Sequence, residues 1–189
     1  MAGVSLLDRC DLAALRAAAA RRGGRYSTLV TCLADTGALA FDPDDPTWTD
    51  RDRLLAGDVH AADAFRAALG PWGWWHAPPG QALAQAVGAA NAAHLDGGAF
   101  RSWCVLGPGA AGDPLLPEAA AAGAATHAPV TAVVADGPSL VAVARLFTAA
   151  GWRADQVDAR DPVALMSALD HALHPAGEPV VVLAEGTDE

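Results

Sequence analysis

The chain has 189 residues, of which 52% are hydrophobic and 18% are charged, and its formal net charge is -10. This length and composition suit one compact domain with its own core and exclude a disordered chain. The acidity argues against nucleic acid or an anionic membrane as partner, and the absence of lysine excludes a P-loop lysine and a Schiff-base lysine.

Cysteine spacing and the pattern of apolar residues indicate where the protein resides. Cys10, Cys32 and Cys104 lie far apart among apolar neighbours, which favours neither a disulfide framework nor a zinc site. We therefore expect buried free thiols. The N-terminus has no charged start followed by an apolar run, and no apolar stretch is long enough to span a bilayer, so we expect a cytoplasmic protein.

The first half of the chain is predicted to be mainly helical. Apolar residues at helical spacing predict helices over residues 6–22, 27–41, 60–69 and 80–95. Residues 23–24, Gly-Gly, form a natural stop after the first helix. The second helix has a competing interpretation as a strand, because Thr28, Val30 and Thr31 are β-branched. Residues 42–50 contain two prolines and predict an extended loop.

The second half of the chain alternates short apolar runs with helices. The runs cover residues 102–106, 130–135, 155–158 and 179–184, and the intervening helices cover 115–126, 139–150 and 163–173. This alternation is typical of a parallel sheet that is covered on both faces. The predicted class is α/β, a three-layer sandwich with a mainly parallel sheet of about five strands. We expect one domain over residues 1–189, with a helical segment 1–41 and an α/β body 42–189.

Four segments, taken in order, resemble a known family. They are DPDDPTWTDRDRLLAGDVHAADAFRAAL from residue 42, PPGQALAQAVGAANAAHLDGG from residue 78, residues 101–137, and FTAAGWRADQVDARDPVALMSALDHAL followed by PVVVLAEGT. Together they are similar to the N-terminal section of the transketolase family, which binds the diphosphate of thiamin diphosphate. The resemblance implies the fold of that domain. It also implies cofactor contacts from six residues, namely His60, Gly80, Gln81, Gly107, Gly109 and Asp136.

The same resemblance shows that the family's magnesium ligands are missing. An aspartate and an asparagine hold Mg²⁺ in the family, and Pro108 and Gly137 stand at those positions. Neither side chain offers an oxygen to a cation that requires near-octahedral oxygen coordination. We therefore predict no metal ligands of the inherited kind. Asp136 could coordinate from a shifted loop, and its alternative role is that of a turn aspartate before Gly-Pro.

Two acidic residues are candidates for a catalytic role. Asp113 and Glu118 align with family glutamates that belong to a carboxylate chain linking active sites across the subunit interface, so the resemblance implies this role for them. Their alternative role is that of ordinary acids near a helix N-terminus, where the helix dipole stabilises negative charge. Similarly, Trp72, Trp74 and Trp75 crowd one short segment and either pack on the edge of the core or form part of an interface.

Two hypotheses of function follow from the resemblance. In the first, the chain is the N-terminal-type subunit of a split, heteromeric transketolase-like enzyme that transfers a two-carbon ketol or acyl unit. Its partner would be a separate C-terminal-type subunit that carries the pyrimidine-binding half, and the pair would form a heterotetramer. In the second, the chain is a noncatalytic pseudo-subunit that binds no cofactor and stabilises or regulates its partner.

Overall fold

A single parallel sheet organises the protein. The computed structural model describes residues 6, 10–24, 26–42, 44–45, 47–70, 73–135, 137, 140–173 and 178–186. Within them, six strands pair in the order β2-β1-β3-β4-β6-β5, and every neighbouring pair is parallel. The strands are β1 (Arg53–Gly57), β2 (Trp74–His76), β3 (Ser102–Leu106), β4 (Val130–Ala135), β5 (Arg153–Asp158) and β6 (Val180–Glu185). The predicted α/β class is confirmed, with six strands instead of about five.

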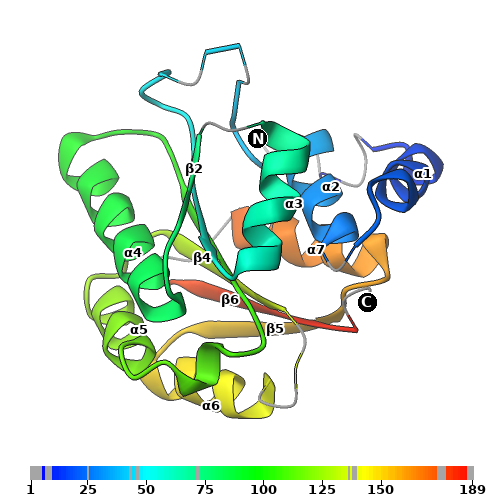
Figure 1. The fold of residues 1–189 in the computed structure, drawn as a ribbon. Coiled ribbons are helices and arrows are strands. Elements are labelled where there is room, and N and C mark those ends of the chain that lie inside the picture. The colour runs from blue at the N-terminus through cyan, green and yellow to red at the C-terminus, as the bar shows by residue number, and fades with distance from the viewer. Residues whose placement is uncertain are drawn as a thin grey trace.

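Helices cover both faces of this sheet and complete three layers (Figure 1). On one side, α3 (Val59–Leu69) and α7 (Pro162–Leu173) contact the sheet, and α1 (Leu12–Arg22) and α2 (Ser27–Asp35) complete the layer by packing against these helices and each other. The other face packs against α4 (Pro79–Asp96), α5 (Leu116–Ala125) and α6 (Leu140–Ala150). The connections through α4, α5 and α6 all run toward the β5 edge, and those through α3 and α7 run the opposite way. Right-handed crossovers require such opposite connections to cross opposite faces.

The central strands have the continuous apolar character that two covered faces demand. All five residues of β3 and all six of β4 are buried. Along β3, Trp103 and Val105 belong to the core on the α3 side, while Cys104 and Leu106 belong to the core on the α4 side. This alternation follows from the period of two in a strand. It explains why the runs were visible in the sequence.

The buried carboxylate of Asp52 connects the loop before β1 to the start of β3. Asp52 is 2% exposed, and its oxygens accept hydrogen bonds from the backbone N–H groups of Arg101 (2.8 Å) and Ala40 (3.0 Å) and from Trp103 Nε1 (3.1 Å). A buried charge of this kind is tolerated only when its oxygens are hydrogen-bonded. Asp52 therefore fixes the loop before β1 against the beginning of β3.

The N-terminal helices differ in length from the predictions. Helix α1 begins at Leu12, where the Asp11 side chain caps the N–H groups of Ala13 and Ala14, whereas residue 6 was expected as its start. Most of residues 1–9 lie outside the described part of the chain. Helix α2 is confirmed as a helix, but it ends at Asp35 instead of residue 41 because Gly37 adopts a left-handed φ of 78°.

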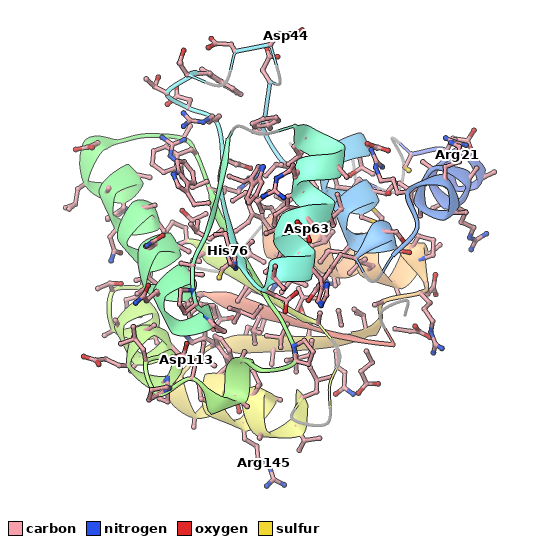
Figure 2. All side chains as sticks on the ribbon, viewed as in Figure 1. Arg21, Asp44, Asp63, His76, Asp113 and Arg145 are labelled. Atoms are coloured by element: carbon pink, nitrogen blue, oxygen red, sulfur yellow. The ribbon has the colours of Figure 1, made fainter. Side chains whose placement is uncertain are left out.

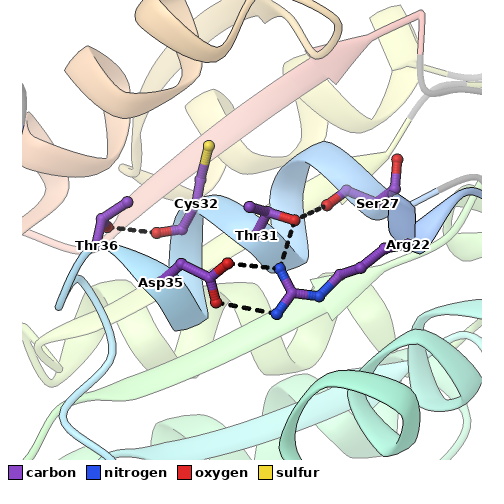
Figure 3. A network of polar contacts seen from close by, with 6 residues as sticks. All are labelled: Arg22, Ser27, Thr31, Cys32, Asp35 and Thr36. Atoms are coloured by element: carbon purple, nitrogen blue, oxygen red, sulfur yellow. Dashed lines mark hydrogen bonds and ion pairs between the residues drawn. The ribbon is translucent and has the colours of Figure 1, made fainter. Parts of the chain in front are cut away.

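A polar network holds α1 and α2 together (Figure 3). The Arg22 guanidinium donates to both oxygens of Asp35, at 2.7 and 2.9 Å, and to Thr31 Oγ1 at 2.8 Å. Thr31 Oγ1 in turn donates to the Ser27 carbonyl oxygen at 2.7 Å. The bidentate geometry is the strong form of an arginine–carboxylate pair. This network leaves Arg22 committed to the contact between the two helices.

Strands β1 and β2 were missed by the sequence reading. Strand β1 is only five residues long and ends in glycine, and β2 has three residues in a segment rich in tryptophan and proline. The two tryptophans of β2 have different environments. Trp74 packs edge-on against Phe65, while Trp75 is 43% exposed and stacks with Arg51. Trp74 therefore extends the core edge, and Trp75 is a surface residue. Trp72 lies outside the described residues.

The cysteines and the length of the helices agree with the sequence. All three cysteines are free; Cys32 and Cys104 are buried, and Cys10 is half-buried. Burial raises the pKa of Cys32 to about 12 and also raises the pKa of Cys104, because the thiolate is disfavoured away from water. In the described part of the chain, every helix is too short or too polar to cross a membrane.

Candidate functional site

A cavity opens where the strand order reverses. From β1 the chain goes to β2 on one side through α3, and β3 then lies on the other side of β1. The crevice beyond the carboxyl ends of such strands is the usual ligand site of an open α/β sheet. Here it holds a cavity of about 400 Å³. Its lining comes from the ends of β1, β2 and β3, namely Gly57, Asp58, Val59, His76, Ala77, Pro78, Pro79, Gly107, Gly109 and Ala110.

The lining of this crevice is small, largely backbone, and acidic. Among the described lining residues, the charged one is Asp58, the imidazole is that of His76, and none is an arginine. His76 is exposed at the end of β2. Such a lining lets a ligand approach the main chain closely, but it offers an anion no positive side chain.

Asp58 lies at the N-terminus of α3, the part of the crevice where an anion would be stabilised most. Its Oδ1 accepts the N–H groups of His60 (2.9 Å) and Ala61 (3.2 Å), which begin α3, and also the hydroxyl of Tyr26 (3.1 Å). A β-carbon on Gly107 would collide with the same carboxylate. Asp58 is thus an N-cap whose side chain lies directly against the backbone after β3. The helix end that could receive a phosphate already holds a carboxylate of the chain itself.

Asp113 has a comparable structural position at the neighbouring helices. Its Oδ2 accepts the N–H of Gly80 at 3.0 Å, and its Oδ1 accepts the N–H of Leu115 at 2.9 Å. These donors lie at the beginnings of α4 and α5, so one carboxylate joins both helix ends (Figure 2). A side chain on Gly80 would meet Asp113 Oδ1 at 2.7 Å. The geometry accounts for Asp113 as a cap, and glycine at position 80 permits the close approach.

The remaining predicted site residues are spread around the crevice. Gly107 and Gly109 line it, whereas Gln81 is exposed on the first turn of α4. His60 is exposed on the first turn of α3 and does not line the cavity. Glu118 is exposed in the first turn of α5. The structure therefore brings Gly107 and Gly109 to one cavity and leaves the side chains of His60 and Glu118 outside it. Asp136 lies outside the described residues.

Pro108 and Gly137 touch each other. A β-carbon on Gly137 would lie 2.5 Å from Pro108 Cβ and 3.0 Å from Pro108 Cα. The end of β3 and the loop after β4 are therefore packed together, with the proline ring against the glycine. Among the described residues, no group of three or more His, Cys, Asp or Glu side chains lies close enough together to hold a metal ion. Pro108 and Gly137 therefore offer no side-chain oxygen to a Mg²⁺ ion, so these two positions do not fit one.

Sequence reasoning did not identify Asp58 or His76 as site residues. A signal for Asp58 was present, since aspartate directly before a helical pattern is a preferred N-cap. His76 had no comparable signal, because it belongs to the unpredicted strand β2 and reaches the cavity only through the pairing of β2 with β1.

The fold is that of the diphosphate-binding section of transketolases. A mutant transketolase from Pichia stipitis in complex with fructose 6-phosphate matches with a TM-score of 0.73 at 20% identity, covering 94% of this chain and 35% of that one. Transketolases from Campylobacter jejuni (0.73, 20%) and Leishmania mexicana (0.72, 18%) each match over 90% of this chain and 35% of their own. No protein-family model and no curated protein matches the chain.

These similarities define the class of fold. At such identities they show a transketolase-like, thiamin diphosphate-binding fold and nothing about activity. The chain spans about a third of the length of these transketolases.

Proposed function

We propose that this chain is the diphosphate-domain subunit of a heteromeric transketolase-like assembly and that it fills this place as a noncatalytic pseudo-subunit. One observation carries the proposal: the chain's own groups lie at the positions that, by resemblance, would hold the diphosphate and its cation. Asp58 holds the start of α3, and Pro108 packs on Gly137 where the cation would lie. In this role the chain stabilises or regulates a partner.

Electrostatics favours the noncatalytic role. A phosphate oxygen placed at the first N–H groups of α3 would lie within about 4 Å of the Asp58 carboxylate. Two like charges at that distance repel by about 4 kcal/mol in a surface-like dielectric, which corresponds to roughly a thousandfold loss of affinity. In a site that keeps Mg²⁺ the cation would offset this repulsion, and Pro108 and Gly137 provide it no ligand.

The proposed partner supplies the pyrimidine-binding half. The chain covers about a third of the length of the transketolases it matches. We propose that a separate C-terminal-type chain carries the pyrimidine-binding half, in a heterotetramer. Asp113 and Glu118 lie at the start of α5, and by resemblance this region faces that interface.

A second candidate function keeps catalysis. It is a split transketolase-like enzyme that transfers a two-carbon ketol or acyl unit, with thiamin diphosphate held near His60, Gly107, Gly109 and Asp136. The persistence of the crevice favours it, since about 400 Å³ remains open at the switch point. Gly107 also keeps the backbone free of a side chain there. No chemical step follows from the described residues alone.

Calorimetric titration of thiamin diphosphate distinguishes the two candidates. The purified chain, and then its complex with the partner, is titrated with and without Mg²⁺. We expect no saturable heat for the chain alone. We also expect none for the complex when the partner's own cofactor-binding residues have been mutated. Saturable, magnesium-dependent binding that this chain contributes would overturn the pseudo-subunit. A matched variant, Asp58→Ser with Pro108→Asp and Gly137→Asn, reinstates the donor types and serves as the positive comparison.

A further inference from the structure

A second cavity lies away from the crevice and has the opposite electrostatic character. It encloses about 340 Å³ between the α1–α2 connection and the loop that follows β5. Its polar lining comes from Arg16, Gly23, Gly24, Ser27, Thr28 and Arg160. Among the described residues, none is shared with the lining of the crevice, and the charged lining residues are Arg16 and Arg160. Because Asp158 pairs with Arg160, Arg16 carries the uncompensated positive charge at this cavity.

Arg16 faces the cavity without a competing carboxylate. It is exposed on α1, and within the described residues no acidic side chain lies at ion-pair distance from it. Arg22, on the same helix, differs because its guanidinium is held by Asp35 and Thr31 (Figure 3). One arginine of α1 is therefore structural, and the other carries a charge that the fold itself does not use.

Arg160, in the loop after β5, is held in a defined orientation. Its Nε donates to Asp158 Oδ1 at 3.0 Å and its Nη2 to Asp158 Oδ2 at 3.2 Å. A β-carbon on Gly186 would lie 2.8 Å from Arg160 Nε, so the guanidinium lies directly over that backbone. The Asp158 pair lowers the pKa of that carboxyl and keeps the guanidinium in place. A preorganised guanidinium loses little conformational entropy when a ligand binds.

The floor of the cavity adds polar groups to the two arginines. Gly23 and Gly24 both have positive φ, 63° and 86°, and a β-carbon on either would meet nothing within 4 Å. The main chain is therefore open to a ligand there. Ser27 and Thr28 begin α2, so the positive end of that helix dipole also faces the cavity.

We propose that this cavity binds a phosphate group, either as inorganic phosphate or as the phosphate of a small monoester. Two guanidiniums at one cavity suit the several oxygens of a phosphate, to which arginine forms charge-assisted hydrogen bonds. A cavity of about 340 Å³ exceeds one phosphate ion and has the size of a small-ligand site. The site is independent of thiamin diphosphate, of magnesium and of the proposed function.

The test is calorimetric titration of the full chain with inorganic phosphate and, separately, with glycerol 3-phosphate, at constant ionic strength without Mg²⁺. Glycerol serves as the control ligand. Saturable heat with either phosphate and none with glycerol is expected. Arg16→Gln and Arg160→Gln should each weaken binding about tenfold, the loss that one charge-assisted hydrogen bond predicts. A monoester that binds more tightly than inorganic phosphate identifies an organic phosphate as the ligand, and equal or weaker binding identifies the free ion.

Arg21→Gln is the matched control, since Arg21 is an exposed arginine of the same helix that does not line the cavity (Figure 2). Its affinity should equal that of the wild type. Absence of saturable heat, or an equal loss in Arg21→Gln and Arg16→Gln, would overturn the proposal. Arg160→Gln also removes the Asp158 pair, so its thermal midpoint is measured. If that variant unfolds, Arg16→Gln decides, because Arg16 makes no hydrogen bond or ion pair within the described residues.

Discussion

The carboxylate of Asp58 should stabilise the fold in the absence of any cofactor. Its Oδ1 caps α3 through His60 and Ala61 and accepts the Tyr26 hydroxyl. Asp58→Ala removes the cap, at a cost of about 1 kcal/mol, and one further hydrogen bond, at about 1 kcal/mol. Asp58→Ser keeps a capping hydroxyl but is too short for Tyr26, so it should cost about 1 kcal/mol. For a chain of this length the expected fall in Tm is about 4–8 °C for alanine and about 2–4 °C for serine.

Urea unfolding followed by far-UV circular dichroism measures these differences. The transition midpoint should fall in the order wild type, Asp58→Ser, Asp58→Ala, with an unchanged slope. A cycle with Tyr26→Phe isolates the hydroxyl contact, and we expect a coupling of about 0.5–1 kcal/mol between positions 26 and 58. Equal midpoints for the serine and alanine variants would show that capping is not the role of Asp58. A midpoint that rises in Asp58→Ala would refute the stabilising role altogether.

Three further predictions concern the core. Asp52→Asn should lower the unfolding free energy by about 2–4 kcal/mol in urea titrations, because an amide cannot accept all three donors on Asp52; a change below about 1 kcal/mol would contradict this. Gly123→Ala should lower the free energy of unfolding by about 1–3 kcal/mol, because its β-carbon would lie 2.9 Å from Trp152 and 3.0 Å from Val87. The matched change Gly88→Ala places its β-carbon in open space and should stabilise the fold by about 0.4–1 kcal/mol. Equal shifts in melting temperature for the two variants would disprove the packing argument. Iodoacetamide should label Cys10 alone in the folded chain, because Cys32 and Cys104 are buried. Burial raises the pKa of Cys32 to about 12 from an ordinary 9.0, so the contribution of this thiol to stability should be complete below pH 9.0 and decline above it, as the unfolded chain ionises first. If the wild type shows no such decline relative to Cys32→Ala, the burial of the Cys32 thiol does not control this pH dependence.

The order of helices and strands in the second half of the chain was readable from the sequence. Strands β3, β4 and β6 are mainly apolar and almost entirely buried because both faces of the sheet are covered, and that property is local to each segment. The α/β class follows from such local patterns. Strands β1 and β2 escaped prediction because they are short, and their pairing with β3 and with each other decides that they are strands.

The character of the candidate site was decided by contacts between distant parts of the chain. That Pro108 and Gly137 carry no side-chain oxygen is visible in the sequence, but their packing against each other is not. Asp58 reaches Tyr26 across 32 residues, and Asp113 reaches Gly80 across 33. Which donor a carboxylate meets depends on how helices pack on the sheet, and no pattern within one segment records it. The sequence therefore determined the architecture of the second half of the chain, and only the tertiary structure showed that Asp58 caps α3 beside the crevice and that Pro108 packs against Gly137.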